Sequence, residues 1–367
     1  MRRSKAIRAT AWGVVAIGVS APLVRRRVKA PPLVTQTVAF CAPIGLCVAM
    51  RRSRTRDVAT CCLQMWAYVA AYKSPHDDEA QQAQRVHVDY PIAVDRALGF
   101  GELPTERLQH RLARVGPDGP RWRTLDKVLV WTHWSWFMVP HGALAYILVC
   151  HPRRFGRAAA MTYAVFDIGA MIYWVLPTAP PWYAAAAPEN GLMGEGNGSG
   201  AGHQAGGGVG DGNGSGAGQR GDDRSRETLA YGSHPRFDQH RAPHRMIEVR
   251  RMMVEYGASF WRDGWGPLYS VFGGNPLAAM PSLHFATSVM AALLLAETGP
   301  VAGAAGWAYA STLGFALVYL GEHYVADLLG GVLLTAAVRR LGPQARPVLE
   351  RSARAVAALE AKAHEAG

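Results

Sequence analysis

The chain has 367 residues, of which 49% are hydrophobic, a formal net charge of +12 and a mean hydropathy of -0.01. Its basic residues form short clusters beside apolar stretches. This pattern fits the flanks of membrane helices and argues against a nucleic-acid partner, which would require basic residues on one folded face. The five cysteines lack metal-ligand spacing and lie in or beside apolar stretches, so no disulfide framework is implied.

Eight stretches are candidates for membrane-spanning helices, each of which requires about 20 apolar residues. In chain order they are 9–24, 31–50, 57–72, 128–150, 158–177, 279–297, 301–320 and 324–338. The first is short and contains Pro22, and three arginines follow it without a convincing cleavage site. We therefore expect an uncleaved first span and not a signal peptide.

The basic clusters predict how the spans are oriented. The cluster at 151–157 and the chain from Arg339 onward are expected in the cytoplasm. Three segments then meet at the outer face, namely 177–182, 281–284 and 322–327. The cluster at 25–29 falls outside under the same scheme, which leaves the orientation of residues 1–30 open.

Polar segments separate some of the spans. Residues 73–127 are too polar to cross a bilayer but contain enough apolar residues to lie in its interface. Residues 191–221 are so rich in Gly that we expect a disordered insert. After it, apolar residues recur at helical spacing from Ile247 to Phe260, which predicts an amphipathic helix on the outer surface.

Three ionisable residues at the expected outer face form one candidate site. His323 and Asp327 are four residues apart, so a helix places them on one face, where the carboxylate can hold the imidazole N–H. His284 lies at the start of another predicted helix. A lone histidine at a membrane boundary is more often an interfacial residue than a catalyst. Three matched groups at one depth favour catalysis.

The residues just before His284 favour an anion. Pro281 suits the first turn of a helix, because the N–H that proline lacks is not needed there. The free N–H groups of that turn and the Ser282 hydroxyl are expected to hold a phosphate.

Other polar residues fall inside the predicted spans. His141 and Asp167 lie mid-span at similar depth, and we expect a buried structural pair and not a proton relay. His133, about one turn below the outer face, is expected to line the cavity.

The motifs resemble those of a known family. Pro281-Ser-Leu-His284, followed by His323-Tyr-Val-Ala-Asp327, resembles the second and third motifs of the type-2 phosphatidic acid phosphatase superfamily. Leu176-Pro-Thr-Ala-Pro-Pro-Trp-Tyr183 resembles the Pro-x-Ala-Pro-Pro-Trp-Tyr motif of inositol phosphorylceramide synthases and their bacterial relatives. The Ala-, Arg- and Gly-rich composition also suggests a high-GC bacterial source. The resemblance covers about 57–340 and implies an all-α integral membrane protein with a six-helix core.

This resemblance sets the expected domains. Residues 1–56 would be an N-terminal transmembrane extension that adds one or two helices to the core. Residues 57–340 would be the catalytic membrane domain, and 341–367 a cytoplasmic tail.

The resemblance also implies roles for the matched residues. His323 would be the nucleophile that forms a phosphohistidine, Asp327 would orient it, and His284 would act as general acid and then as general base. The expected substrate-binding residues are Ser282, Pro281, Pro180, Pro181, Trp182 and Tyr324. This scheme needs no metal or other cofactor, and the sequence contains no obvious metal-binding motif.

Two basic features of the phosphatase branch are missing. That branch carries a Lys-x6-Arg-Pro motif near the end of the third core helix, and an Arg six residues before the nucleophile. Here 158–183 contains no basic residue and Leu317 holds the second position. Because phosphoryl transfer relies on cations, one must come from elsewhere, or the start of the helix at Ser282 must replace it. The candidates are Arg245, Arg250, Arg251, Arg262, Arg96 and Lys127.

The sequence therefore predicts a lipid phosphotransferase in the plasma membrane with a lipid phosphate substrate. It would move a phospho-headgroup, phosphoinositol among the options, between lipids at the extracytoplasmic face. The alternative is a lipid phosphate phosphatase of the phosphatidate or polyprenyl phosphate type. A transporter with a polar path through His141 and Asp167 predicts internal repeats, and the sequence shows none. Headgroup, acceptor and oligomeric state are left open.

Overall fold

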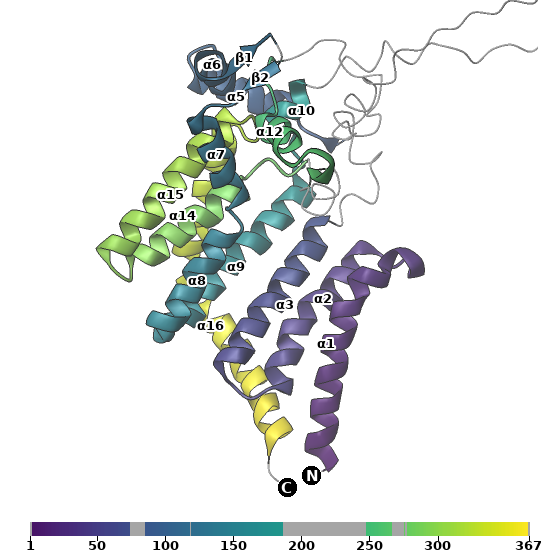
Figure 1. The fold of residues 1–367 in the computed structure, drawn as a ribbon. Coiled ribbons are helices and arrows are strands. Elements are labelled where there is room, and N and C mark those ends of the chain that lie inside the picture. Colours follow the sequence, from purple (N-terminus) through teal and green to yellow (C-terminus); the bar gives the residue numbers. More distant parts are fainter. Residues whose placement is uncertain are drawn as a thin grey trace, which may run out of the picture.

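A computed structural model describes residues 2–73, 85–117, 119–185, 247–265, 275 and 277–365. Nearly all of its regular structure is helical, and the only strands among these residues form one short hairpin (Figure 1). The predicted insert at 191–221 lies outside the described residues, and so does Arg245, one of the six candidates for the phosphate-binding cation.

The elements have the following bounds along the chain. They are α1 (Arg2–Val28), α2 (Pro32–Ala49), α3 (Arg54–Lys73), α5 (Asp89–Leu98), α6 (Pro104–Leu112), β1 (Arg114–Gly116), β2 (Gly119–Arg121), α7 (Thr124–Trp134), α8 (Met138–Cys150), α9 (Pro152–Val175), α10 (Pro181–Ala185), α12 (Met252–Trp261), the 3₁₀ helix η3 (Arg262–Gly264), α14 (Leu283–Ala296), α15 (Pro300–Tyr319) and α16 (Val325–His364).

Helices α1, α2, α9 and α15 are each long and apolar enough to cross a membrane. Helices α8 and α14 are apolar but shorter, and α3 is a full-length helix that falls below the same measure of hydropathy. The chain is therefore an all-α, multi-pass membrane protein, as the sequence predicted.

The expected single span at 128–150 is wrong, because the structure divides it into α7 and α8. The break lies at residues 135–137, just before Pro140 in the first turn of α8. Proline has no N–H to donate, and in a continuous helix its ring would clash with the carbonyl four residues earlier, that of Trp136. The break leaves Trp136 outside both helices, with its indole Nε1 donating to Thr287 Oγ1 of α14 at 2.9 Å.

Helix α16 continues well beyond the predicted last span and forms one helix through residues 341–364. Its far end returns to the turn between α2 and α3, where Arg56 pairs with Glu360 at 2.8 Å. At the same end of the bundle, three arginines from α9 and α16 surround Glu297. Arg56 and the arginines around Glu297 thus lie toward the end of the bundle that carries both termini, opposite the motif segments, whereas the cluster at 25–29 lies at the other end of α1 (Figure 1).

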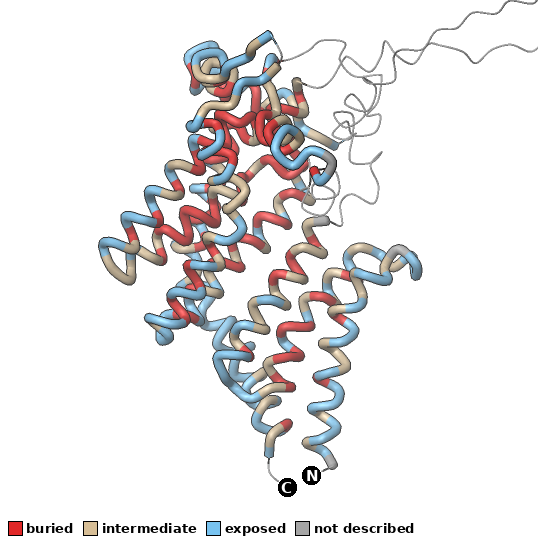
Figure 2. The backbone as a smooth tube through the Cα atoms, in the orientation of Figure 1, coloured by how far each residue is buried: buried red, intermediate tan, exposed pale blue. Residues whose placement is uncertain are grey.

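The main core lies between α3, α8, α9, α14 and α16. Small residues let these helices approach closely. A Cβ on Gly169 of α9 would lie 2.3 Å from Leu283 of α14, and one on Gly331 of α16 would lie 2.7 Å from the Ser282 carbonyl. Figure 2 shows that burial is heaviest in this bundle and at the end that carries α5, α6, α10 and α12, and light along α1.

The predicted amphipathic helix at 247–260 is shorter than expected, and its first turns are buried while Phe260 and Trp261 at its end are exposed. It begins at Met252, and the side chains of Ile247 and Met252 are only 2% and 1% exposed. Gln109 explains the late start, because its side chain accepts from the Arg250 N–H at 2.8 Å and donates to the Arg250 carbonyl at 2.9 Å. Those backbone groups are then unavailable to a helix.

Candidate active site

Backbone hydrogen bonds join the three motif segments at one end of the bundle. Thr178 of the first segment donates to Leu277 O at 2.9 Å, and the Trp182 N–H donates to Gly321 O at 3.3 Å. The Ser282 N–H donates to Asp327 O at 2.9 Å. These bonds fix the positions of the segments relative to one another independently of their side chains.

His323 lies between the other two members of the predicted trio. Its Nδ1 is 3.2 Å from Asp327 Oδ2, and its Nε2 is 3.1 Å from His284 Nδ1. Because an ionised carboxylate can only accept, Nδ1 of His323 carries a proton, and in the neutral ring Nε2 then carries a lone pair. His284 Nδ1 therefore donates to that lone pair. The arrangement directs the reactive nitrogen of His323 toward His284.

The backbone around Asp327 holds its side chain in place. Its Oδ2 also accepts the Tyr324 N–H at 2.9 Å, and both side chains are fully buried. Tyr324 packs in an apolar cluster with Ile92 and Leu103. This predicted substrate-binding residue therefore contributes to the site through its backbone, which positions the carboxylate of Asp327.

The predicted phosphate cradle at the start of α14 is largely occupied by the protein. The Ser282 N–H binds Asp327 O, and the Leu283 N–H donates to the Tyr173 hydroxyl at 3.3 Å. The Phe285 N–H donates to Ser282 Oγ, which caps the helix and is fully buried. Pro281 precedes the helix and its carbonyl accepts from Tyr173. The expectation of free N–H groups at this helix start is therefore corrected.

The first motif packs behind the trio. Pro180 and Pro181 are buried, and the Trp182 ring, 8% exposed, is covered by the Arg251 guanidinium, whose Cζ lies 3.6 Å from the ring centroid. Trp182, a predicted substrate-binding residue, thus contacts Arg251, one of the six candidates for the phosphate-binding cation.

Sequence reasoning missed Asp95 of α5. Its fully buried carboxylate accepts the N–H groups of Val325 and Ala326, at 2.9 and 2.8 Å, and so caps the start of α16. Burial raises the pKa of Asp95 to about 6, and the charge of Asp327 adds to the rise although the two hydrogen bonds oppose it. Asp95 therefore fixes the turn that separates His323 from Asp327.

Trp136 and His133 complete the wall around His284. The Trp136 ring centroid lies 4.2 Å from that of His284, and the His133 ring stacks on His284 at 5.1 Å. In the part of the chain that the structure describes, neither ring nitrogen of His133 has a hydrogen-bond partner. The prediction that His133 lines the cavity fits this position, whereas the role of Trp136 depends on the helix break.

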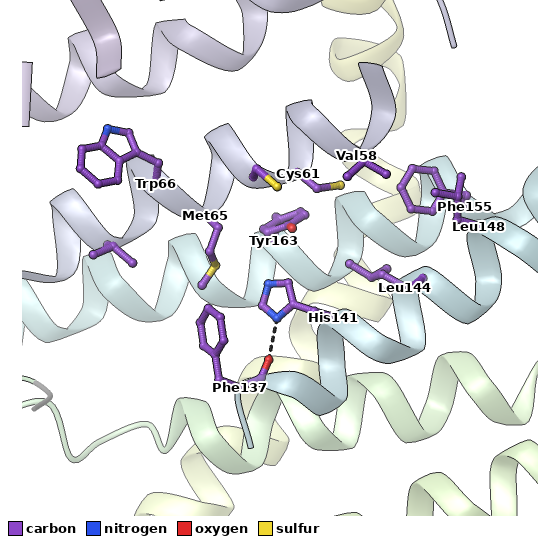
Figure 3. Close-up of a pocket in the computed structure, with 13 residues that line it drawn as sticks. Val58, Cys61, Met65, Trp66, Phe137, His141, Leu144, Leu148, Phe155 and Tyr163 are labelled. Atoms are coloured by element: carbon purple, nitrogen blue, oxygen red, sulfur yellow. Dashed lines mark hydrogen bonds between the residues drawn. The ribbon is translucent and has the colours of Figure 1, made fainter. Parts of the chain in front are cut away.

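His141 and Asp167 do not form the expected pair. Asp167 accepts from Gln64 Nε2 at 2.8 Å, and the His141 ring bonds to the Phe137 carbonyl at 2.7 Å. His141 and Phe137 instead help to line a largely apolar cavity of about 470 Å³ between α3, α8 and α9 (Figure 3). Phe137 also contacts Trp136, so this cavity adjoins the aromatic wall of the site.

No group of three metal-ligating side chains occurs within the described ranges. The site built from these residues is one of imidazoles and carboxylates. Its geometry suits nucleophilic attack by one histidine with proton transfer by the other.

The helices and the trio of adjoining side chains define a multi-pass membrane protein with a His–His–Asp site. Residues 235–341, which include His284, His323 and Asp327, match the family model of the PAP2 superfamily. The match supports placing the chain in that superfamily and supports an enzyme of the lipid phosphatase or phosphotransferase type. Comparisons with curated proteins and with solved structures gave no match.

Proposed function

We propose that the protein is a membrane lipid phosphotransferase that moves a phospho-headgroup between lipids through a phosphohistidine on His323. The observation that carries the proposal is the double contact of His323, with Asp327 on one ring nitrogen and His284 on the other. Asp327 orients the ring and supports the positive charge that develops as it attacks.

In the first half-reaction, the His323 Nε2 lone pair attacks phosphorus and forms the N–P bond. The P–O bond to the leaving lipid alcohol breaks, and His284, acting as the imidazolium, protonates the departing oxygen and becomes neutral. In the second half-reaction, an acceptor hydroxyl gives its proton to His284 and attacks phosphorus. The N–P bond breaks and its electrons return to Nε2.

The two histidine rings have to separate during this reaction. A distance of 3.1 Å between Nε2 and His284 Nδ1 leaves no room for phosphorus between them, since reacting atoms start about 3–3.5 Å apart. The His284 ring therefore turns aside as the phosphoryl group approaches, and then meets the leaving oxygen. Trp136 and His133 flank the path of that ring.

Two further observations support a lipid substrate at the extracytoplasmic face. The apolar cavity beside Trp136 and Phe137 suits a hydrocarbon chain. The arginines around Glu297 lie at the opposite end of the bundle, which the positive-inside rule assigns to the cytoplasm.

A phosphatase is the second candidate, because only the acceptor distinguishes the two reactions. Water in place of the lipid hydroxyl would release free phosphate from a monoester. Transfer is favoured by the Pro-Pro-Trp segment at 180–182 and by the absence of basic residues in 158–183.

The mechanism is tested by replacing His323 with alanine. The purified variant is expected to lose at least about a thousandfold in turnover of lipid phosphate esters while remaining folded in detergent. His110→Ala, on the exposed surface of α6, is the matched control and should keep wild-type turnover. Equal turnover in wild type and His323→Ala would contradict the mechanism.

The acceptor is tested with labelled phosphatidylinositol and a lipid alcohol. We expect label to appear in a new phospholipid and transiently on His323. Release of free phosphate alone, and only from a monoester, would identify the phosphatase instead.

A further inference from the structure

We infer that Arg251 is the cation that binds the phosphate oxygens, held for this purpose by Trp182 and Glu322. The inference rests on the proposed function and names the residue that replaces the missing basic positions of the phosphatase branch.

The need for such a cation follows from the site itself. Charge on the transferring phosphoryl group is normally stabilised by cations, but Leu317 is fully buried where the phosphatase branch has an arginine. The start of α14 offers little in place of that cation, because the N–H groups of Ser282, Leu283 and Phe285 bind protein atoms.

The backbone of Arg251 is fixed against the turn that carries His323. The Met252 N–H donates to Leu320 O at 3.2 Å. The side-chain Nε2 of Gln109 donates to the carbonyls of both Arg250 and Tyr319, each at 2.9 Å. Gly321 permits this approach. Its φ is +82° and a Cβ there would lie 2.6 Å from the Arg250 carbonyl.

The Arg251 side chain is directed by two contacts. Its Nε is 3.2 Å from Glu322 Oε1, and its Cζ lies 3.6 Å above the Trp182 ring. The Arg251 and Glu322 side chains are only 17% and 10% exposed, so this ion pair is far better shielded from water than one on the surface. Glu322 directly precedes His323, so this ion pair joins Arg251 to the residue next to the nucleophile in the chain.

His133 connects Arg251 with the two catalytic histidines. The charges of Arg251 and Glu322 both act on the ring of His133, and that ring stacks on His284. Both nitrogens of His133 are buried and lack a partner among the described residues. Buried polar atoms are normally satisfied, so a phosphate oxygen between Arg251 and His133 would meet donors from both sides.

The other candidates are less well placed. Arg250 is held by Glu255 through its Nε and its terminal nitrogen. Three further candidates are exposed, namely Arg96, Lys127 and Arg262. Arg251 contacts both the first motif segment, through Trp182, and the third, through Glu322.

This arrangement gives Trp182 and Glu322 defined tasks. The indole face is a flat support for a guanidinium, a contact that a lysine ammonium would make less well. Arginine carries five donors in a fixed fork, so it can keep Glu322 and bind phosphate oxygens at the same time. Glu322 competes with the anion and thereby limits how tightly phosphate is held.

Variants at three positions test the assignment, with inorganic phosphate as the probe and the full-length enzyme in detergent. Arg251→Ala should weaken phosphate binding at least about tenfold and lower kcat/KM about a thousandfold, the scale of other cations that stabilise phosphoryl transfer. Arg250→Ala, the matched control, should change neither. Glu322→Gln should instead tighten phosphate binding severalfold, because a competing negative charge is removed.

Two additional measurements exclude a merely structural effect. Arg251→Lys keeps the charge but not the planar stack, so its kcat/KM should fall between those of wild type and Arg251→Ala. Added guanidinium ion should restore part of the activity of Arg251→Ala. It should not stimulate wild type.

Unchanged phosphate binding and turnover in Arg251→Ala would overturn the assignment, and turnover that still depends on His323 would leave the proposed function standing. Conversely, phosphate binding could depend on Arg251 while His323→Ala leaves turnover unchanged. That result would support Arg251 as the phosphate-binding cation and contradict the phosphohistidine. Phosphate binding is expected to weaken in Arg251→Ala and to tighten in Glu322→Gln. A general loss of structure would not produce these opposite changes in affinity.

Discussion

The two ends of the bundle use their charged groups in different ways. At the motif end, Asp95, Asp126 and Asp327 are fully buried, and each accepts hydrogen bonds from backbone N–H groups. At the opposite end, Glu297 meets arginines whose side chains are between 32% and 58% exposed. Buried carboxylates therefore define the geometry at one end, and water screens the charges around Glu297 at the other.

This difference predicts where substitutions have large effects. A buried group that loses its partner costs about 1–3 kcal/mol, and more when it is charged. An exposed ion pair contributes at most about 1 kcal/mol. The motif end should therefore be sensitive to single atoms. The basic end should depend on the overall excess of positive charge, which orients the chain in the bilayer.

Asp327→Asn is expected to have the largest effect of the substitutions that keep the shape of a side chain. The neutral amide cannot replace the charged carboxylate that meets both the His323 N–H and the Tyr324 N–H. The His323 ring therefore loses its fixed tautomer and the negative charge that stabilises it during attack. We expect kcat to fall by about 10³ to 10⁴, as when the orienting carboxylate of other histidine-based sites is neutralised. Steady-state kinetics on a lipid phosphate ester measures this. A loss below tenfold would show that Asp327 does not orient the nucleophile.

Asp95→Asn should have the next largest effect, because Asp95 positions the start of α16. One of its two oxygens becomes an NH₂ group that faces a backbone N–H, so one cap is lost. We expect a loss of about 1–3 kcal/mol in stability and a fall in kcat of about tenfold or more, with KM little changed. A change in KM alone would contradict a positioning role.

The same variant isolates a pH dependence. Burial raises the pKa of Asp95 to about 6, whereas an unfolded aspartate titrates near about 3.9. The folded state therefore binds the proton more tightly, and the stability gained in this way is full below about pH 4 and lost as the pH rises through about 6. The stability of wild type relative to Asp95→Asn should fall over that range, as thermal unfolding in detergent would measure. A difference that grows with pH would contradict the raised pKa.

The trio and most spans could be predicted because they depend on short-range patterns. A spacing of four residues places His323 and Asp327 on one helical face, and a run of apolar residues needs no partner to be recognised. Pro140 was a visible signal for the break between α7 and α8, since proline ends or kinks a helix. That signal was overlooked because the apolar run around it is continuous.

Asp95 and Arg251 could not be identified because their partners are distant in the sequence. Asp95 binds the backbone 230 residues away, and Arg251 pairs with a glutamate 71 residues away. The sequence named Arg251 only as one of six candidates. The expected His141–Asp167 pair failed for a related reason. Similar depth in the membrane does not determine which way a side chain points around its helix axis.

Trp136→Phe tests the contribution of the helix break to the site. Phenylalanine keeps much of the ring contact with His284 but loses the hydrogen bond to Thr287. We expect kcat/KM to fall about tenfold, the equivalent of one hydrogen bond of about 1.4 kcal/mol. Trp131→Phe, on the exposed side of α7, is the control. Equal kinetics of the two variants would remove Trp136 from the site.

The smallest effect is expected for Glu297→Gln at the basic end. Its partners Arg154, Arg157 and Arg339 have side chains that are 53%, 58% and 32% exposed, so each pair contributes under about 1 kcal/mol. Turnover should stay within about twofold of wild type, and thermal stability should change less than in Asp95→Asn. Added salt should reduce the remaining difference, because it screens exposed charges. A loss of stability as large as that of Asp95→Asn would show that the basic end also depends on individual charges. The contrast between the two ends would then be wrong.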